Sequence, residues 1–181
     1  MVQEKGRVHI YYGDGKGKTT AACGLALRAA GWNEKVYLFF FFKSPFRSGE
    51  MRAFSSLKNF KKFCFNMRHP FFIKECDKAL YRKELKIELN KFLKKIELTL
   101  KTKKKKLVIL DEVLTAIDEN LISKEKLIDL LKTKAPKIEV VLTGRPRPPR
   151  SILVLADYIS EIKNLKHPYQ KGVLARKGID F

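Results

Sequence analysis

The segment that decides the fold is VHIYYGDGKGKTT, residues 8–20 of a 181-residue chain. Its first part, 8–12, is largely apolar, aromatic or β-branched, which is typical of a buried strand. Three glycines then form a turn that permits positive φ and leaves room for backbone N–H groups to face an anion. An alanine-rich stretch, 21–30, follows and favours a helix. The order of strand, glycine-rich turn and helix predicts a phosphate-binding loop.

Lys18 and the two threonines after it complete a motif close to G-x-x-x-x-G-K-[ST]. The first glycine of that pattern falls on Tyr12, so the match consists of Gly-Lys-Thr and a glycine-rich approach. Lys18 supplies a positive charge, and Thr19 and Thr20 place hydroxyl groups at a helix N-terminus, where phosphate is favoured. The alternative is a glycine-rich turn with no ligand. We favour the phosphate site because all of its parts occur in the required order.

Composition predicts one globular domain over residues 1–181 with a strongly basic surface. Hydrophobic residues make up 45%, while 39 Lys and Arg against 19 Asp and Glu give a net charge of +20. That charge is compatible with a polyanionic ligand, with nucleic acid, or with a lysine-coated surface alone. No helix-turn-helix or aromatic-basic platform for nucleic acid is recognisable.

Cysteine usage and hydropathy point to a soluble, cytoplasmic protein. The three cysteines, Cys23, Cys64 and Cys76, form no C-x-x-C pair, which argues against a disulfide scaffold and against a zinc site. The first seven residues contain no signal-peptide apolar region. The longest apolar run, 36–42, is far too short to span a bilayer.

Strands and helices are expected to alternate along the chain. This pattern predicts an α/β fold with a mostly parallel sheet and helices on both faces. The expected strands are 7–12, 35–42, 61–66, 107–110, 138–142 and 158–162. The expected helices are 18–30, stopping at Gly31 as C′ residue, then 51–57, 77–99, 124–132 with Ser123 as cap, and 151–156.

A block of lysines at 101–106 resembles a nucleic-acid contact. Because it directly precedes the strand 107–110, it belongs at the end of the sheet opposite the phosphate-binding loop. We therefore interpret it as a solvated tether.

Acidic residues follow the strand 107–110, in the form of a Walker B motif. Asp111 or Glu112 would then lie near Mg²⁺, beside the hydroxyl of the phosphate-binding loop. The alternative is that Asp111 caps the helix that begins at 113. Thr-Gly-Arg at 143–145 also follows a strand, so all three segments are expected to converge on one edge of the sheet. These features predict a nucleoside triphosphate site without choosing its reaction.

Several separated segments resemble the ATP:cob(I)alamin (corrinoid) adenosyltransferase family of the P-loop type. The segments are 13–22, Phe42-Lys43 with Gly49-Glu50, 110–113, 143–145, 155–157 with Glu161, and a tail with His167-Pro168-Tyr169, Gly172, Ala175 and 178–181. The resemblance covers nearly the whole chain, except that 51–105 matches poorly and Tyr12 replaces the family's threonine. It implies a P-loop NTPase-like (RecA-like) fold. It also implies transfer of the 5′-deoxyadenosyl group of ATP to Co(I) of a reduced corrinoid, with release of triphosphate.

The resemblance implies ATP and Mg²⁺ (or Mn²⁺), a flavodoxin-like or other reductase as partner, and a homodimer. From the short apolar runs and the lack of a nucleic-acid platform, we expect neither a membrane nor a nucleic acid as partner. The alternatives are a nucleic-acid-binding P-loop ATPase and a small-molecule kinase.

On this resemblance, specific residues receive roles. Phosphate binding falls to Gly13, Asp14, Gly15, Lys16, Gly17, Lys18, Thr19 and Thr20. The residues expected to act in the reaction are Lys18, Thr19, Glu112 and Arg145, and the metal-binding candidates are Thr19 with Asp111 or Glu112.

Three of the other assignments each carry an alternative. Arg145 contacts the triphosphate or nucleotide, or is a salt-bridged loop residue. Phe71 and Phe72 form an apolar wall near the cobalt, or a hydrophobic staple under their loop. His167 contacts substrate, or fixes the C-terminal loop. Lys43 and Glu50 are expected to border the site, and His9 to be packed in the core.

Overall fold

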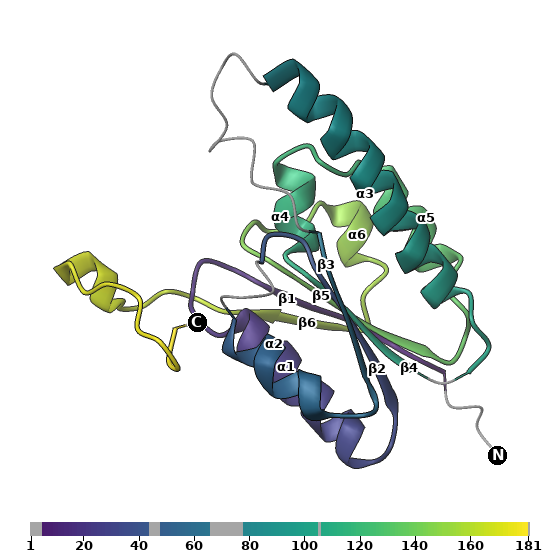
Figure 1. The fold of residues 1–181 in the computed structure, drawn as a ribbon, viewed down its shortest axis with the longest axis horizontal. Helices are drawn as coiled ribbons and strands as arrows, with labels where there is room; N and C mark the ends of the chain where they lie inside the picture. The colour runs from purple at the N-terminus through teal and green to yellow at the C-terminus, as the bar shows by residue number, and fades with distance from the viewer. Residues whose placement is uncertain (1–4, 44–47, 66–77, 105, 181) are drawn as a thin grey trace.

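Six parallel strands form one sheet in the order β3-β2-β4-β5-β1-β6 (Figure 1). The structure is a computed structural model, and it describes residues 5–43, 48–65, 78–104 and 106–180. The strands are β1 Val8–Tyr12, β2 Lys35–Phe40, β3 Phe60–Cys64, β4 Lys106–Asp111, β5 Ile138–Gly144 and β6 Tyr158–Glu161.

Helices cover both faces of this sheet. They are α1 Lys18–Gly31, α2 Gly49–Ala53, α3 Lys78–Leu100, α4 Val113–Asp118, α5 Lys124–Lys132 and α6 Arg150–Leu153, with short 3₁₀ turns η1 Phe54–Ser56 and η4 Pro168–Lys171. α1 and α2 lie on one face, and α3, α4, α5 and α6 lie on the other (Figure 1). The α/β prediction, with a parallel sheet between two helical layers, is confirmed.

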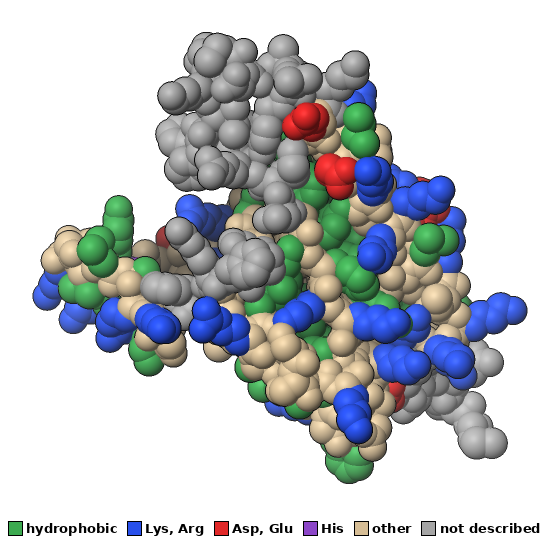
Figure 2. All heavy atoms as spheres, in the orientation of Figure 1, with side chains coloured by type: hydrophobic (Ala, Val, Ile, Leu, Met, Phe, Trp, Pro, Cys, Tyr) green, Lys and Arg blue, Asp and Glu red, His purple; other side chains and the backbone are tan. Residues whose placement is uncertain are grey.

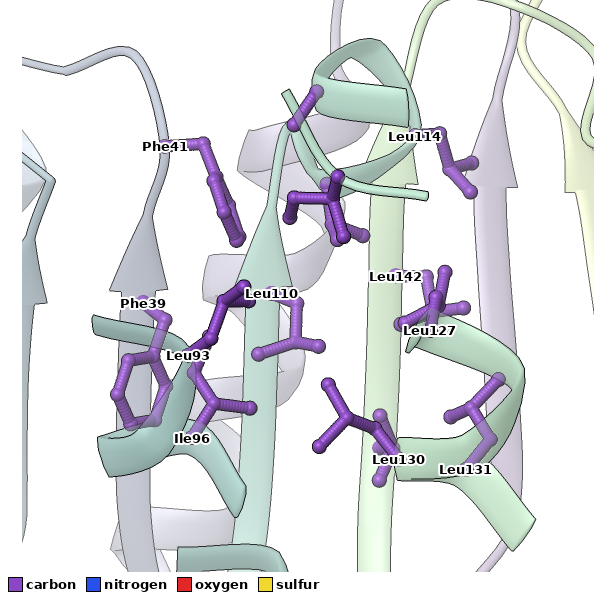
Figure 3. Packing of buried hydrophobic residues seen from close by; sticks show 14 of the residues in the cluster. Phe39, Phe41, Leu93, Ile96, Leu110, Leu114, Leu127, Leu130, Leu131 and Leu142 are labelled. Carbon is purple, nitrogen blue, oxygen red and sulfur yellow. The ribbon is translucent and has the colours of Figure 1, made fainter. Parts of the chain in front are cut away.

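Two hydrophobic cores follow from this arrangement. Strand residues alternate between the faces, so β4 sends Leu110 towards α3 and Ile109 towards α1. Figure 3 shows the larger core, where side chains of α3, α4 and α5 meet the sheet. All six residues of β4 are buried, which explains the continuous apolar run of its four central residues, 107–110. The edge strand β6 is exposed along its whole length.

Some predicted element boundaries are wrong. β2 ends at Phe40, although the apolar run continues. Phe41 lies outside the strand, and its ring packs edge-on against that of Phe92, with 5.2 Å between the ring centres. Gly31 is not a left-handed C′ residue: α1 runs through it, and the positive φ, 60°, occurs at Asn33. α6 ends at Leu153, short of the predicted end.

The lysine block also needs a correction at its last residue. Lys103 and Lys104 are exposed, as expected of a solvated tether. Lys106, in contrast, is the first residue of β4 and is buried, with its ammonium 4.6 Å from the centre of the Tyr37 ring. The exposed part of the block therefore ends before the strand begins.

Positive charge dominates the visible face of the molecule, where Lys and Arg side chains far outnumber acidic ones (Figure 2). Cys23 and Cys64 are free thiols, and Cys76 lies outside the described residues. Within the described ranges, no helix combines the length and apolar character needed to cross a membrane.

Candidate active site

The loop between β1 and α1 is packed against the segments that follow β5 and β6. The N–H of Gly13 donates to the carbonyl of Arg145 at 3.0 Å, and the N–H of Gly15 donates to that of Ile162 at 2.8 Å. Gly13 has φ +120°, and a Cβ there would lie 2.3 Å from the Ile162 oxygen, so the position requires glycine. These two N–H groups are therefore occupied, and an anion would meet the later part of the loop and the first turn of α1.

Two other residues of the loop are engaged elsewhere in the protein. Asp14 accepts a hydrogen bond from the N–H of Asn164 at 3.0 Å, which holds the segment after β6 against the loop. The ammonium of Lys16 pairs with the Asp180 carboxylate and donates to the Ile179 carbonyl at 3.1 Å. The C-terminal arm, which extends beyond β6 in Figure 1, thus returns to the loop. This contact was not predicted from the sequence, since no local signal joins residues so far apart.

Lys18 is buried within its own loop. Its side chain is 8% exposed, and its ammonium donates to the Gly15 carbonyl at 2.7 Å. Burial lowers the pKa of Lys18, whereas the negative charge of Glu112 opposes that shift and the positive charge of Arg145 adds to it. The Lys18 ammonium therefore lies close enough to Glu112 and Arg145 for their charges to influence its pKa. Thr20, in the first turn of α1, is exposed.

Asp111 is the centre of the polar cluster at the end of β4. It is 1% exposed, and its Oδ1 accepts from the hydroxyls of Thr19 at 2.9 Å and Thr143 at 2.8 Å. Its Oδ2 is the one buried side-chain N or O atom without a hydrogen-bond partner in the part of the chain that is described. The ammonium of Lys43 lies 3.3 Å from this oxygen.

The donor atoms fit a hard divalent cation. A carboxylate oxygen with no hydrogen bond lies on the same side chain that accepts the Thr19 hydroxyl, and oxygen ligands of this kind suit Mg²⁺ or Mn²⁺. Of the two acidic candidates, Asp111 contacts Thr19, whereas the Glu112 carboxylate accepts from Thr115 Oγ1. No cluster of three or more His, Cys, Asp or Glu ligands occurs among the described residues, so any cation here would use water and phosphate as further ligands.

The helix-cap alternative for Asp111 is wrong. The residue at the N-cap of α4 is Glu112, which has a left-handed φ of 62°, and Asp111 is the last residue of β4.

The end of β2 adds a charged pair beside Asp111. Lys43 lies 3.8 Å from the Glu50 carboxylate and 5.2 Å from the centre of the Phe40 ring. Burial would raise the pKa of Glu50, but hydrogen bonds from Ser48 and from its own backbone, together with Lys43, hold it below its usual value. Lys43 and Glu50 therefore lie beside the Asp111 cluster, where the sequence placed them.

The end of β5 completes the cluster. A Cβ on Gly144 would lie 2.5 Å from that of Leu114, so glycine allows α4 to approach the strand closely. Arg145 is exposed, and its N–H donates to Thr115 Oγ1 at 3.2 Å. Within the described ranges its guanidinium makes no ion pair, so the salt-bridged alternative finds no support there.

Both remaining histidine predictions are clarified. His167 caps η4, with Nδ1 accepting the N–H of Tyr169 at 3.2 Å, which is a contact within the C-terminal loop. The His9 ring is mostly buried at the other end of the sheet, 2.6 Å from a Glu139 oxygen. Phe71 and Phe72 lie outside the described residues.

The structure therefore gathers one set of predicted residues at the carboxyl end of the sheet. This set is Lys18, Thr19, Lys43, Glu50, Asp111, Glu112 and the backbone of Arg145. The sequence interpretation gave no role to the hydroxyls of Thr143 and Thr115. Thr143 begins the Thr-Gly-Arg segment, which was the available signal for it.

Comparison with known proteins finds relatives that match nearly the whole chain. The chain is 31% identical over 179 residues to the corrinoid adenosyltransferase of Escherichia coli K12, covering 98% of this chain and 87% of that protein. It is 30% identical over 184 residues to the corrinoid adenosyltransferase CobA of Salmonella typhimurium, covering 99% and 87% of the two chains.

Among solved structures, the chain is similar to EssC (ATPases 2 and 3) from Geobacillus thermodenitrificans, with a TM-score of 0.52 at 17% identity. That likeness covers 97% of this chain and only 35% of the other, so it shows the ATPase-like fold alone. The profile of the family described as ATP:corrinoid adenosyltransferase BtuR/CobO/CobP matches residues 4–181. The chain therefore belongs to the ATP:corrinoid adenosyltransferase family.

Proposed function

We propose that this protein transfers the 5′-deoxyadenosyl group of ATP to the cobalt of a reduced corrinoid, in the biosynthesis or salvage of the adenosylated cofactor. The observation that carries the proposal is the meeting of Thr19, Asp111 and Lys43 next to the phosphate-binding loop of a chain that matches this family throughout. We include in the proposal Mg²⁺ or Mn²⁺, a flavodoxin-like or other reductase, a homodimeric state and a cytoplasmic location.

The proposed reaction is a substitution at carbon. The electron pair of Co(I) forms a bond to C5′, the bond from C5′ to oxygen breaks, and its electron pair leaves with the triphosphate. Cobalt is thereby oxidised formally from Co(I) to Co(III). Because the cobalt itself is the nucleophile, the protein needs no nucleophilic side chain. Burial, with Asp111 as a second cause, raises the pKa of the nearby Cys23 thiol to about 12, which keeps it protonated.

The side chains at the carboxyl end of the sheet would hold the leaving group. Lys18 and Arg145 would supply positive charge to the phosphates, and Thr19 and Asp111 would hold the divalent cation. When bound, the cation neutralises charge that grows on the departing triphosphate. The ammonium of Lys16 reaches phosphate only by exchanging its Asp180 partner.

The protein's contribution is thus orientation and charge stabilisation. A loop that is pinned by Arg145 and Ile162 presents the triphosphate in a fixed position relative to the corrinoid.

The test is a direct assay of the full chain. The protein is incubated without oxygen with ATP, Mg²⁺ and chemically reduced cobalamin or cobinamide, and the adenosylcorrin spectrum and inorganic triphosphate are measured. Appearance of both products supports the proposal. ADP and phosphate formed only in the presence of nucleic acid, or a phosphorylated small molecule with no adenosylcorrin, would overturn it in favour of an ATPase or a kinase.

A matched pair of variants assigns the activity to this site. Asp111→Asn should lower the rate by about 10²-fold or more, because the charge that holds the cation is lost. Asp118→Asn, at the exposed end of α4, should leave the rate unchanged. Equal rates in the two variants would show that Asp111 has no part in the reaction.

A further inference from the structure

We propose that Thr143 is a positioning residue that aims the Asp111 carboxylate and fixes the backbone of Glu112, and so presets the site for its cation. This inference rests on the proposed function for its meaning in catalysis. The contacts that carry it are present in the protein alone. They come from the end of β5, the strand that lies between β4 and β1 in the sheet.

The Thr143 hydroxyl is completely buried and makes two hydrogen bonds of defined direction. It accepts the N–H of Glu112 at 2.8 Å and donates to Asp111 Oδ1 at 2.8 Å. A hydroxyl has a single hydrogen, and a backbone N–H can only donate. The Thr143 hydrogen is therefore directed at the carboxylate.

The consequence for Asp111 is that its two oxygens become different. Oδ1 accepts both Thr143 and Thr19, which occupies the directions in which this oxygen accepts hydrogen bonds. Oδ2 keeps no hydrogen bond and lies 3.3 Å from Lys43. Thr143 thus turns one oxygen of the pair into an anchor, and a cation that binds the other oxygen would take the place of its contact with Lys43.

The second consequence concerns Glu112. Its left-handed backbone is uncommon for a residue other than glycine, and such conformations persist where neighbouring groups hold them. Here the Glu112 N–H is held by Thr143, and its carboxylate is held by Thr115. The turn from β4 into α4 is therefore fixed by hydroxyls from both sides.

The test separates the hydroxyl from the packing of the side chain. Two comparisons isolate the hydroxyl. The unaltered protein is compared with Thr143→Val, in which a methyl group replaces the hydroxyl. Thr143→Ser is compared with Thr143→Ala, two variants that both lack the methyl group of threonine and differ in the hydroxyl. We measure kcat and KM for ATP in the adenosylation assay. Separately, we titrate Mn²⁺ into the protein with an ATP analogue that carries a methylene bridge, in the absence of corrinoid, and follow bound Mn²⁺ by electron paramagnetic resonance.

The expected results are specific to the hydroxyl. Valine and alanine should each weaken Mn²⁺ binding by about 10-fold and lower kcat by about 10- to 100-fold, as for other residues that orient a metal ligand. KM for ATP should change far less, because the Thr143 hydroxyl is hydrogen-bonded to Asp111 and Glu112 and not to the phosphate-binding loop. Serine should restore both Mn²⁺ affinity and kcat. Thr99→Val, which removes a buried hydroxyl bonded to Lys95 on α3, should change neither.

Two results would overturn the inference: Mn²⁺ affinity unchanged in the valine and alanine variants, or serine as defective as alanine, which would assign the effect to packing of the methyl group. If the valine variant fails to fold, the serine and alanine pair decides alone. If the unaltered protein makes no adenosylcorrinoid, the proposed function fails, and the Mn²⁺ titration still tests Thr143.

Discussion

The two ends of the parallel sheet both hold charged side chains, but they pair those charges differently. At the amino end, both oxygens of Glu139 have partners, since one lies 2.6 Å from His9 Nε2 and the other accepts the Arg7 N–H at 2.6 Å. Asp157 likewise accepts from the Arg7 guanidinium at 2.8 Å and the Val8 N–H at 2.9 Å. At the carboxyl end, Asp111 keeps one buried oxygen without a hydrogen bond.

This difference separates architecture from function. A buried polar group that lacks a hydrogen-bond partner costs free energy, so folded proteins rarely keep one without a reason. Lys134 illustrates the amino end, because burial lowers its pKa and yet its ammonium donates to two carbonyls, those of Gly6 and Ile138. The amino end is therefore a closed set of contacts that ties strands together, whereas at the carboxyl end Asp111 Oδ2 has Lys43 at 3.3 Å and no hydrogen bond, a contact that a ligand could replace.

The largest effect that would test this contrast is the loss of Lys18. Lys18→Ala should lower adenosylation by about 10²- to 10³-fold, because the proposed function assigns this positive charge to the triphosphate. Stability should change by about 1 kcal/mol or less, because the lost hydrogen bond to Gly15 is offset by relief of a lysine whose pKa is lowered by burial. Activity and urea unfolding are measured on the same preparation.

Lys35→Ala is the matched control, because Lys35 is exposed at the amino end of β2. If Lys18→Ala retained full activity, the assignment of the phosphate-binding loop would be wrong.

The sequence predicted much of the carboxyl end, because its signals are local. The order of strand, loop and helix at 8–20, and an apolar run that ends in Asp111, both follow from neighbouring residues. Parallel topology then requires these strand ends to share one edge. The connections between strands were beyond such reasoning. Thr143 reaches Asp111 because β5 lies next to β4, and strand order is set by tertiary packing.

The errors have the same origin. Lys106 is buried because it pairs with Lys35 of β2 on one side and with Ile138 of β5 on the other. β4 therefore begins one residue before its apolar run. Phe41 lies beyond the end of β2, and its apolar side chain packs against Phe92 of α3. Local composition does not report which element packs on a residue, and for Lys106 it did not indicate burial at all.

The second test removes a closed contact at the amino end. Glu139→Ala should destabilise the protein by about 1–2 kcal/mol, because the Arg7 N–H and His9 lose their acceptor while the site remains partly open to water. Adenosylation at a temperature well below unfolding should be unchanged. Urea unfolding gives the stability, and Glu125→Ala, at an exposed position in α5, serves as the control. A loss of activity at unchanged stability would show that the amino end takes part in the reaction.

A smaller effect is expected from pH. Burial would raise the pKa values of Glu139 and Asp157, but hydrogen bonds from His9 and the Arg7 N–H to the first, and from the Val8 N–H and the Arg7 side chain to the second, lower both. A carboxylate with a lowered pKa binds protons more readily in the unfolded state, so its stabilisation is complete above the unfolded pKa values of about 4. It is lost as the pH falls through the lower, folded values.

Unfolding free energies at pH 7, 5, 4 and 3 measure this loss. Glu50 at the carboxyl end also has a lowered pKa, so the informative quantity is the difference between the unaltered protein and Glu139→Ala. That difference should shrink below about pH 4. A difference that stays constant down to pH 3 would contradict the role given to the Glu139 carboxylate.

The smallest effect concerns the lysines that precede β4. The double variant Lys103→Ser, Lys104→Ser should leave turnover unchanged and should change the free energy of unfolding by no more than about 0.5 kcal/mol. The reason is that both side chains are exposed at the end of the sheet opposite the site. Lys106→Ser should cost about 0.5–1 kcal/mol, because its ammonium lies over the Tyr37 ring, and should leave turnover unchanged. Thermal unfolding and the adenosylation assay distinguish these outcomes. If the double variant lost most of its turnover, the positive charge at the amino end would have to act on substrate or partner, and the division between a closed end and an open end would fail.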